Sequence, residues 1–431
     1  MAIMVLSFSY ENQIITVSSY DRLNPRLFDL VVLIGLMFIF PKYLLYIKKT
    51  DFYIKIWIIL VIWFLLCALI WGVFLLPKEL GAFSIHRALK YMQGLVPITI
   101  FNLKNINISE KRILRLSMIW SGVFLSLYSI FEYTGLFGII ENDGILGPFK
   151  ESYFQLSQTA PVYFSLCYYS YAFENSIRKK IALIIISFLI IVPLFLSGSR
   201  TGIAYVVIIV IVSIIYKKDI WKSFLIYLLI SFIAAIFLHY YSGIDIKNAP
   251  TLSRIEQLER KVDKTDNIIS RLSYPLTFSP NKYEAGNLLF LIGAGFNVAT
   301  ADLGFGYFRP RIDYGFHNMY LFPLEQAGIL GLILFIIFLF SIIKKYHIEK
   351  KRVLIKEDSI FNAAGFAYFI SMLFIGIGGH NFWQGFASGN VNTLILIFMI
   401  ISLKINKKTA GVQNSSQIAL RSEPSETLLY K

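Results

Sequence analysis

Two stretches of the sequence combine ionisable side chains with apolar surroundings, and the first is the segment SGSRTG around Arg200. An ionisable side chain at the middle of a bilayer costs about 2.5–3.5 kcal/mol on insertion scales, so such residues beside apolar segments are candidates for function. The flanking Gly198 and Gly202 would let other groups approach the guanidinium closely. An interfacial arginine that reaches lipid headgroups would leave the same pattern, and this segment alone does not decide between the two interpretations.

The second stretch, RPRIDYGFHNMYLFPLEQAGILG, contains Arg309 and Arg311, then His317 and Asn318, and then Glu325. An unpaired glutamate inside an apolar segment would be costly, so we expect Glu325 to have a partner or a hydrated cavity. A histidine at a helix start is often only an interfacial residue. The charged residues close to His317 nevertheless favour a catalytic role for it.

Two weaker candidates lie elsewhere in the chain. Arg87 and Lys90 are one helical turn apart near the beginning of an apolar segment, where they could face a pocket or anchor a helix end; we favour the pocket. His380 occurs in GGHNFWQG, a context that fits a simple interfacial turn as well as a substrate-binding site.

These residue types suit an anionic substrate and an acid–base step. Arginine donates two hydrogen bonds at once to planar, multiply charged anions such as diphosphates. A histidine that titrates near neutral pH can take a proton from an attacking hydroxyl. A lipid-linked diphosphate donor and a hydroxyl acceptor would use both. The sequence has no phosphate-binding glycine loop, zinc motif or dinucleotide motif, so we expect no metal and no cofactor.

Membrane-spanning helices must position these residues. Of the 431 residues, 56% are hydrophobic, which suits lipid and would give a water-soluble protein large exposed apolar patches. We predict an all-α polytopic membrane protein with about eleven, or twelve, transmembrane helices. The predicted spans are 27–47, 54–76, 83–103, 113–140, 155–173, 181–197, 202–216, 223–241, 318–343, 360–379 and 389–403.

Basic residues predict the orientation of these spans. Clusters of Lys and Arg follow every second span, and the positive-inside rule puts these six connections in the cytoplasm. This distribution accounts for the net charge of +15 without nucleic-acid binding. Arg200, His317 and His380 then belong to the outer side. Cys67 and Cys167 fall inside spans, where small core residues are more common than a disulfide or a metal site.

The topology divides the chain into four predicted parts. An N-terminal transmembrane bundle (1–241) precedes a large outer loop (242–317), and C-terminal transmembrane helices (318–404) precede a cytoplasmic tail (405–431). Loops as long as 242–317 are usually functional. The polar composition of the tail is typical of disorder.

Three stretches together resemble the superfamily of O-antigen polymerases and O-antigen ligases, which assemble bacterial surface polysaccharides. LFLSGSRTGIAYVVIIVIV resembles the serine-arginine turn of that family, and LIGAGFN resembles its glycine-rich element late in the large loop. HNMYLFPLEQAGILG is similar to its His-Asn pattern, with glycines at positions 328 and 331. The resemblance covers residues 140–345, and the rest of the chain is similar mainly in hydropathy.

This resemblance implies a metal-independent glycosyltransferase in the bilayer of the bacterial inner membrane, with its active site facing the periplasm and residues 242–317 as a periplasmic loop. The donor would be an oligosaccharide linked to undecaprenyl diphosphate, and a chain-length regulator is a conceivable partner. By analogy, Arg200 would bind the diphosphate with help from Arg309 or Arg311. His317 would be the general base or would position the acceptor hydroxyl.

Two activities of the superfamily share these motifs. A polymerase joins lipid-linked repeat units in lipopolysaccharide biosynthesis, whereas a ligase transfers the finished glycan to lipid A–core. We favour the polymerase, because aromatic-rich outer loops suit a repeat-specific sugar site. A transporter or flippase of lipid-linked sugars would also have many spans and buried cations. However, the sequence shows no inverted repeat, and one large one-sided loop suits catalysis at one face better.

Overall fold

The computed structural model describes residues 47–70, 73–74, 78–133, 153–197, 199–216, 291–293, 319–353, 355–377 and 390–405, together with residues 34 and 37. Its elements are the 3-10 turn η3 (Ile47–Lys49) and the helices α4 (Phe52–Ile70), α5 (Lys78–Leu103), α6 (Ile108–Tyr133), α7 (Tyr153–Ala172), α8 (Ile177–Leu196), α9 (Arg200–Tyr216), α14 (Phe322–Lys350), α15 (Lys356–Ile375) and α16 (Asn390–Leu403). No strand occurs among the described residues.

Five of these helices, α4, α6, α8, α14 and α15, are long and apolar enough to cross a membrane. Helices α9 and α16 are apolar but shorter, with 17 and 14 residues. These helices agree with the prediction of an all-α protein with several membrane spans. The predicted spans 27–47 and 223–241, the large loop 242–317 and the tail 405–431 lie almost entirely outside the described residues.

Several helix boundaries differ from the prediction in a way that concerns charged residues, and those of α5 and α6 are two examples. Helix α5 begins at Lys78, before the predicted start at residue 83, so Lys90 lies well inside the helix. Helix α6 begins at Ile108, before the predicted start at residue 113, so Lys111 and Arg115 are helical. Hydropathy ends a span at its first charged residue, whereas backbone hydrogen bonding continues through charged residues that find partners.

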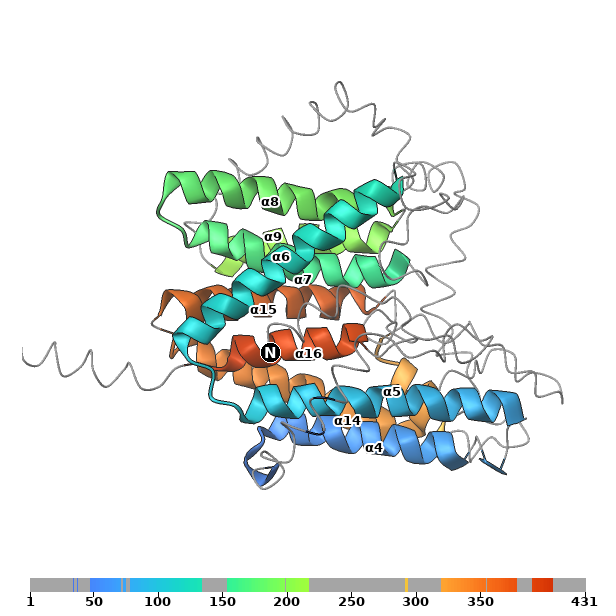
Figure 1. Ribbon diagram of the computed structural model, residues 1–431. Coiled ribbons are helices and arrows are strands. Elements are labelled where there is room, and N and C mark those ends of the chain that lie inside the picture. Colours follow the sequence, from blue (N-terminus) through green and yellow to red (C-terminus); the bar gives the residue numbers. More distant parts are fainter. Residues whose placement is uncertain are drawn as a thin grey trace, which may run out of the picture.

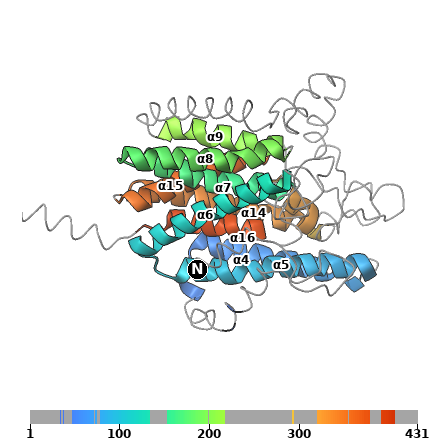
Figure 2. The same cartoon turned by 45° about the horizontal axis from the view of Figure 1, so that its top comes forward.

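The helices form a bundle in which α15 and α16 lie between two groups (Figures 1 and 2). On one side, α4 packs between α5 and α14, and on the other, α6, α7, α8 and α9 pack together. Helix α15 contacts α7, α9 and α16, and α16 also contacts α5. The central helices therefore connect the two groups.

Polar residues are buried on the sides of the helices that face other helices of the bundle. Helix α7 buries Ser157, Gln158 and Thr159, and α16 is buried along almost its whole length. The outer helices instead expose large apolar side chains, as expected for lipid contact. Examples are Ile59, Ile62 and Leu66 on α4, Trp120 and Phe124 on α6, Ile181 and Ile185 on α8, and Ile333, Ile336 and Phe340 on α14.

Consecutive helices run in alternate directions, so the described chain has two ends. The basic end comprises residues 47–51, 103–108, 172–177, 344–353 and 403–405, and the turns from α5 to α6 and from α7 to α8 lie there, at the left of Figure 1. The Arg200 end comprises residues 199–202, 319–322 and 373–377, where α9 and α14 begin and α15 ends. Five of the six predicted cytoplasmic clusters lie at least partly among described residues, and these parts belong to the basic end.

Candidate functional site

Arg200 opens helix α9, and the surrounding SGSRTG residues build this helix start. The hydroxyl of Ser199 accepts a hydrogen bond from the Gly202 N–H at 3.4 Å, which is the geometry of a helix N-cap. A Cβ on Gly202 would lie 2.7 Å from Leu194 and 3.2 Å from Ser157, so glycine lets α9 approach α8 and α7 closely. Arg200 was predicted to lie in the turn before α9, but it is the first residue of the helix.

The Arg200 side chain is exposed and makes no hydrogen bond or ion pair with any described residue. It also stands at a helix N-terminus, where unpaired backbone N–H groups carry a partial positive charge. The guanidinium and the helix dipole therefore favour the same ligand, an anion.

The second predicted stretch is attached to the end of helix α15. The Met319 N–H donates to the Gly376 carbonyl oxygen at 2.8 Å, and the Tyr320 hydroxyl donates to the Leu373 carbonyl oxygen at 2.6 Å. Met319 directly follows His317-Asn318 in the sequence. Five of the predicted site residues lie outside the described residues: His317, Asn318, Arg309, Arg311 and His380.

Helix α14 is interrupted close to its start by Gly328, whose φ of 68° and ψ of −166° are not helical. A Cβ at this position would lie 2.1 Å from the carbonyl oxygen of Leu291, so residues 291–293 rest directly against the interruption. Next to it, the Trp63 indole N–H donates to the Ala327 carbonyl oxygen at 2.8 Å. The described parts of LIGAGFN and HNMYLFPLEQAGILG, residues 291–293 and 319–331, therefore meet at Gly328.

Two more predicted residues belong to described helices, but their side chains lie outside the description. Glu325 is in the first turn of α14, before the interruption at Gly328, and Arg87 is in the first half of α5. Both positions belong to the half of the bundle nearer the Arg200 end.

Lys90 is buried in the interior of the bundle, so it does not anchor a helix end. Its neighbour Tyr91 accepts a hydrogen bond from the Asn392 amide at 2.8 Å, which joins α5 to α16. A Cβ on Gly94 would lie 2.4 Å from the Thr393 hydroxyl oxygen, so the two helices also approach closely. The Asn392 amide oxygen is buried and accepts no hydrogen bond from the described residues.

The interface between α5 and α16 is thus a polar region inside the bundle, and the sequence analysis did not identify it. The sequence NVNT at the start of α16 could have indicated it, because two asparagine side chains lie there in an otherwise apolar segment. Buried amides normally have hydrogen-bond partners, so such a segment indicates polar contacts in the interior.

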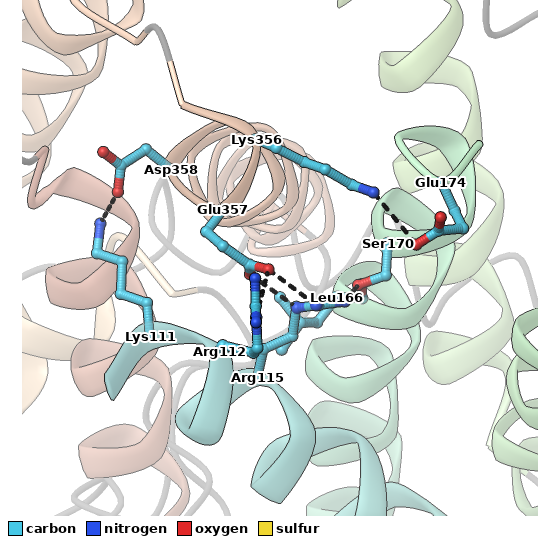
Figure 3. A network of polar contacts seen from close by, with 9 residues as sticks. All are labelled: Lys111, Arg112, Arg115, Leu166, Ser170, Glu174, Lys356, Glu357 and Asp358. Carbon is cyan, nitrogen blue, oxygen red and sulfur yellow. Dashed lines mark hydrogen bonds and ion pairs between the residues drawn. The ribbon is translucent and has the colours of Figure 1, made fainter. Parts of the chain in front are cut away.

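At the basic end, ion pairs join α6 to α15, and a hydrogen bond from Arg115 to the Ser170 hydroxyl joins α6 to α7 (Figure 3). Lys111 Nζ lies 2.5 Å from Asp358 Oδ1, both side chains are fully buried, and Lys111 also donates to the Lys404 carbonyl oxygen. Arg115 donates to the two Glu357 carboxylate oxygens at 2.9 and 3.0 Å. These contacts fix the start of α6 against the start of α15.

Further ion pairs extend this network towards the surface. Lys356 Nζ lies 3.2 Å from Glu174 Oε2, across the α7–α8 turn. Glu174 accepts hydrogen bonds from the backbone N–H groups of Ser176 and Asn175 and from the Lys356 side chain. These hydrogen bonds lower the pKa of Glu174 to about 2, so its carboxylate is charged at neutral pH.

In the sequence, these lysines and arginines indicated only the topology. Lys111 and Asp358 are separated by 247 residues, and no local pattern indicates such a pair. The spacing of Lys111 and Arg115, one helical turn apart, and the adjacent acidic pair Glu357-Asp358 were the available signals. The described residues contain no group of three or more His, Cys, Asp or Glu side chains that could hold a metal ion.

Comparison of the chain with models of known protein families and with curated proteins gives no match.

Proposed function

We propose that this protein is an O-antigen polymerase, a glycosyltransferase that joins oligosaccharide repeat units carried on undecaprenyl diphosphate. In this proposal the reaction takes place at the periplasmic face of the bacterial inner membrane, which corresponds to the Arg200 end of the bundle. Two observations support it: three sequence stretches resemble the polymerase and ligase superfamily, and the described residues of these stretches lie towards one end of the bundle.

The observation that carries the proposal is the packing of α9 against α15. The rings of Tyr205 and Tyr368 stack with their centroids 5.4 Å apart. Tyr205 lies little more than one helical turn after Arg200. Tyr368 lies about two turns before Gly376, whose carbonyl oxygen accepts the hydrogen bond from Met319. The start of α9 and the residue that follows His317-Asn318 are therefore fixed at the same end of one helix pair.

The proposed reaction is a single displacement at the anomeric carbon of the donor. A hydroxyl of the acceptor repeat unit attacks this carbon, the bond to the diphosphate oxygen breaks, and the electron pair leaves with the diphosphate. His317 takes the proton of the attacking hydroxyl or positions that hydroxyl. Arg200 and the α9 N-terminus stabilise the negative charge that grows on the leaving diphosphate, which lowers the barrier because this charge is largest late in the reaction.

The test uses the full-length protein purified in detergent, with a lipid-linked oligosaccharide as donor and acceptor. The proposal expects longer glycans on undecaprenyl diphosphate. Arg200→Ala and His317→Ala should each reduce the rate about a hundredfold or more. Arg200→Lys should remain impaired, because a lysine cannot donate two parallel hydrogen bonds to the diphosphate. Lys351→Gln, an exposed change at the basic end, is the matched control and should leave the rate unchanged.

Each alternative gives a different result. A ligase would lengthen no lipid-linked glycan and would instead transfer it to added lipid A–core. A transporter would produce no new glycosidic bond in detergent, where no sealed membrane exists. Full activity of Arg200→Ala, with normal amounts of folded protein, would remove Arg200 from the mechanism.

A further inference from the structure

A groove lies at the basic end, between the start of α4 and the last turns of α14. It has a volume of about 510 Å³, and its lining residues belong to α14, to α4 and to Asp51 just before α4. Phe52 of α4 and Phe340 of α14 form part of its walls, and their side chains are 62% and 66% exposed. Because α4 and α14 are both apolar enough to cross a membrane, the acyl chain of a lipid can cover these two rings.

The residues along the α14 wall change in polarity from one turn to the next. Ile337 and Phe340 come first, Ser341 follows, then Lys344 and Lys345, and Ile348 ends the wall one turn nearer the basic end. Their spacing of three or four residues puts them on one face of the helix, and Lys344 lies about 10 Å further along the axis than Ile337. An apolar wall thus leads through a hydroxyl to two ammonium groups, which is the order of acyl chain, ester region and phosphate in a phospholipid.

The charges in the groove are not equally available. Lys345 Nζ lies 3.4 Å from Asp51 Oδ1 and 3.2 Å from Glu349 Oε1, so its charge is already neutralised. Asp51 also accepts a hydrogen bond from the Asn102 amide at 3.0 Å. Lys344 is exposed and forms no ion pair with any described residue. The ammonium group of Lys344 is therefore the positive charge that a ligand would meet.

We propose that this groove binds an anionic phospholipid of the leaflet at the basic end. Its acyl chain would lie along Ile337 and Phe340, and its phosphate would contact Lys344. This site is at the opposite end of the bundle from Arg200, so the inference does not depend on the proposed reaction.

The test measures lipid binding to the full-length protein in detergent by native mass spectrometry. The probes are phosphatidylglycerol and phosphatidylcholine with identical acyl chains, because only the first carries a net negative charge. Wild-type protein should bind phosphatidylglycerol more tightly. Lys344→Gln should weaken this binding about fivefold and leave phosphatidylcholine unchanged, as expected for the loss of one lysine next to an anionic headgroup.

Two further variants separate the groove from its surroundings. Lys351→Gln removes an exposed charge outside the groove and should bind both lipids like the wild type. Ser341→Trp should weaken the binding of both lipids, because its ring would fill the groove. Unchanged thermal unfolding of each variant without lipid shows that it is folded.

Several outcomes would overturn the proposal. Phosphatidylglycerol binding that is unchanged in Lys344→Gln would contradict it, as would equal binding of both lipids to wild-type protein. Displacement of the lipid by millimolar inorganic phosphate would indicate a free-anion site, and a dimer that Ser341→Trp abolishes would indicate that a second copy of the chain occupies the groove.

Discussion

The ion pairs of the basic end differ in how much water reaches them. The side chains of Lys111 and Asp358 are both fully buried. Arg112, one residue further on, lies 3.6 Å from the Glu357 carboxylate but is 65% exposed. Removing one partner of a buried pair leaves an uncompensated charge in a medium of low dielectric constant, whereas water solvates the partner of an exposed one.

We therefore predict very different stabilities for two neighbouring variants. Lys111→Met should lower the free energy of unfolding by about 3–5 kcal/mol, because Asp358 is left buried without its cation. Arg112→Gln should change it by about 0–1 kcal/mol. Thermal unfolding of the purified protein in detergent measures both. The same unfolding temperature for the two variants would mean that burial of the pair does not determine its contribution.

A second test at this site replaces both charges. The double variant Lys111→Met with Asp358→Leu should recover part of the stability lost in Lys111→Met, because no unpaired charge remains. A double variant that is less stable than Lys111→Met would show that Asp358 stabilises the fold through contacts other than its pair with Lys111.

At the scale of helices, the interruption in α14 shows what a single glycine allows. Gly328 has a positive φ, which residues with a Cβ adopt only at a cost, and the Leu291 carbonyl occupies the space a Cβ would need. The interruption thus depends both on a backbone conformation and on a close contact with a segment distant in sequence.

Gly328→Ala is therefore predicted to destabilise the protein by at least about 2 kcal/mol. Leu330→Ala, a partly exposed change in the same helix, should cost about 0.5 kcal/mol or less. Thermal unfolding in detergent compares the two. If Gly328→Ala is as stable as Leu330→Ala, the contact with Leu291 is not a fixed part of the fold.

Helix positions were predictable from sequence, whereas contacts between helices were not. Nine of the eleven predicted spans coincide with described helices, because an apolar segment that must satisfy its backbone in lipid has almost no alternative to a helix. The pairing of Lys111 with Asp358 and the contact of Leu291 with Gly328 depend on how distant segments pack. Hydropathy contains no information on either contact.

In the candidate site too, individual residues were predictable from sequence, whereas their contacts were not. Arg200 and Lys90 were found because charged residues beside apolar segments are unusual. The sequence could not place Tyr91, the residue next to Lys90, beside Asn392, since that contact comes from the packing of α5 on α16. The role of His317 stays a prediction, because this residue lies outside the described part of the chain.

At the scale of the whole molecule, the two ends of the bundle differ in charge. The basic end gathers the loops that are rich in lysine and arginine, and ion pairs join its helices to one another. The Arg200 end carries the stretches that resemble a glycosyltransferase. If the positive-inside rule holds, the basic end faces the cytoplasm and the Arg200 end faces outward.

This orientation can be measured with single cysteines in intact cells. Cys67 and Cys167 are both fully buried, so the wild-type protein should react little with a membrane-impermeant maleimide. Ile377→Cys, at an exposed position of the Arg200 end, should be labelled from outside once the outer membrane is permeable. Ser176→Cys, exposed at the basic end, should be labelled only after the inner membrane is also opened. Labelling of Ser176→Cys before Ile377→Cys would place Arg200 in the cytoplasm and exclude a periplasmic reaction, even if the helices are arranged as described.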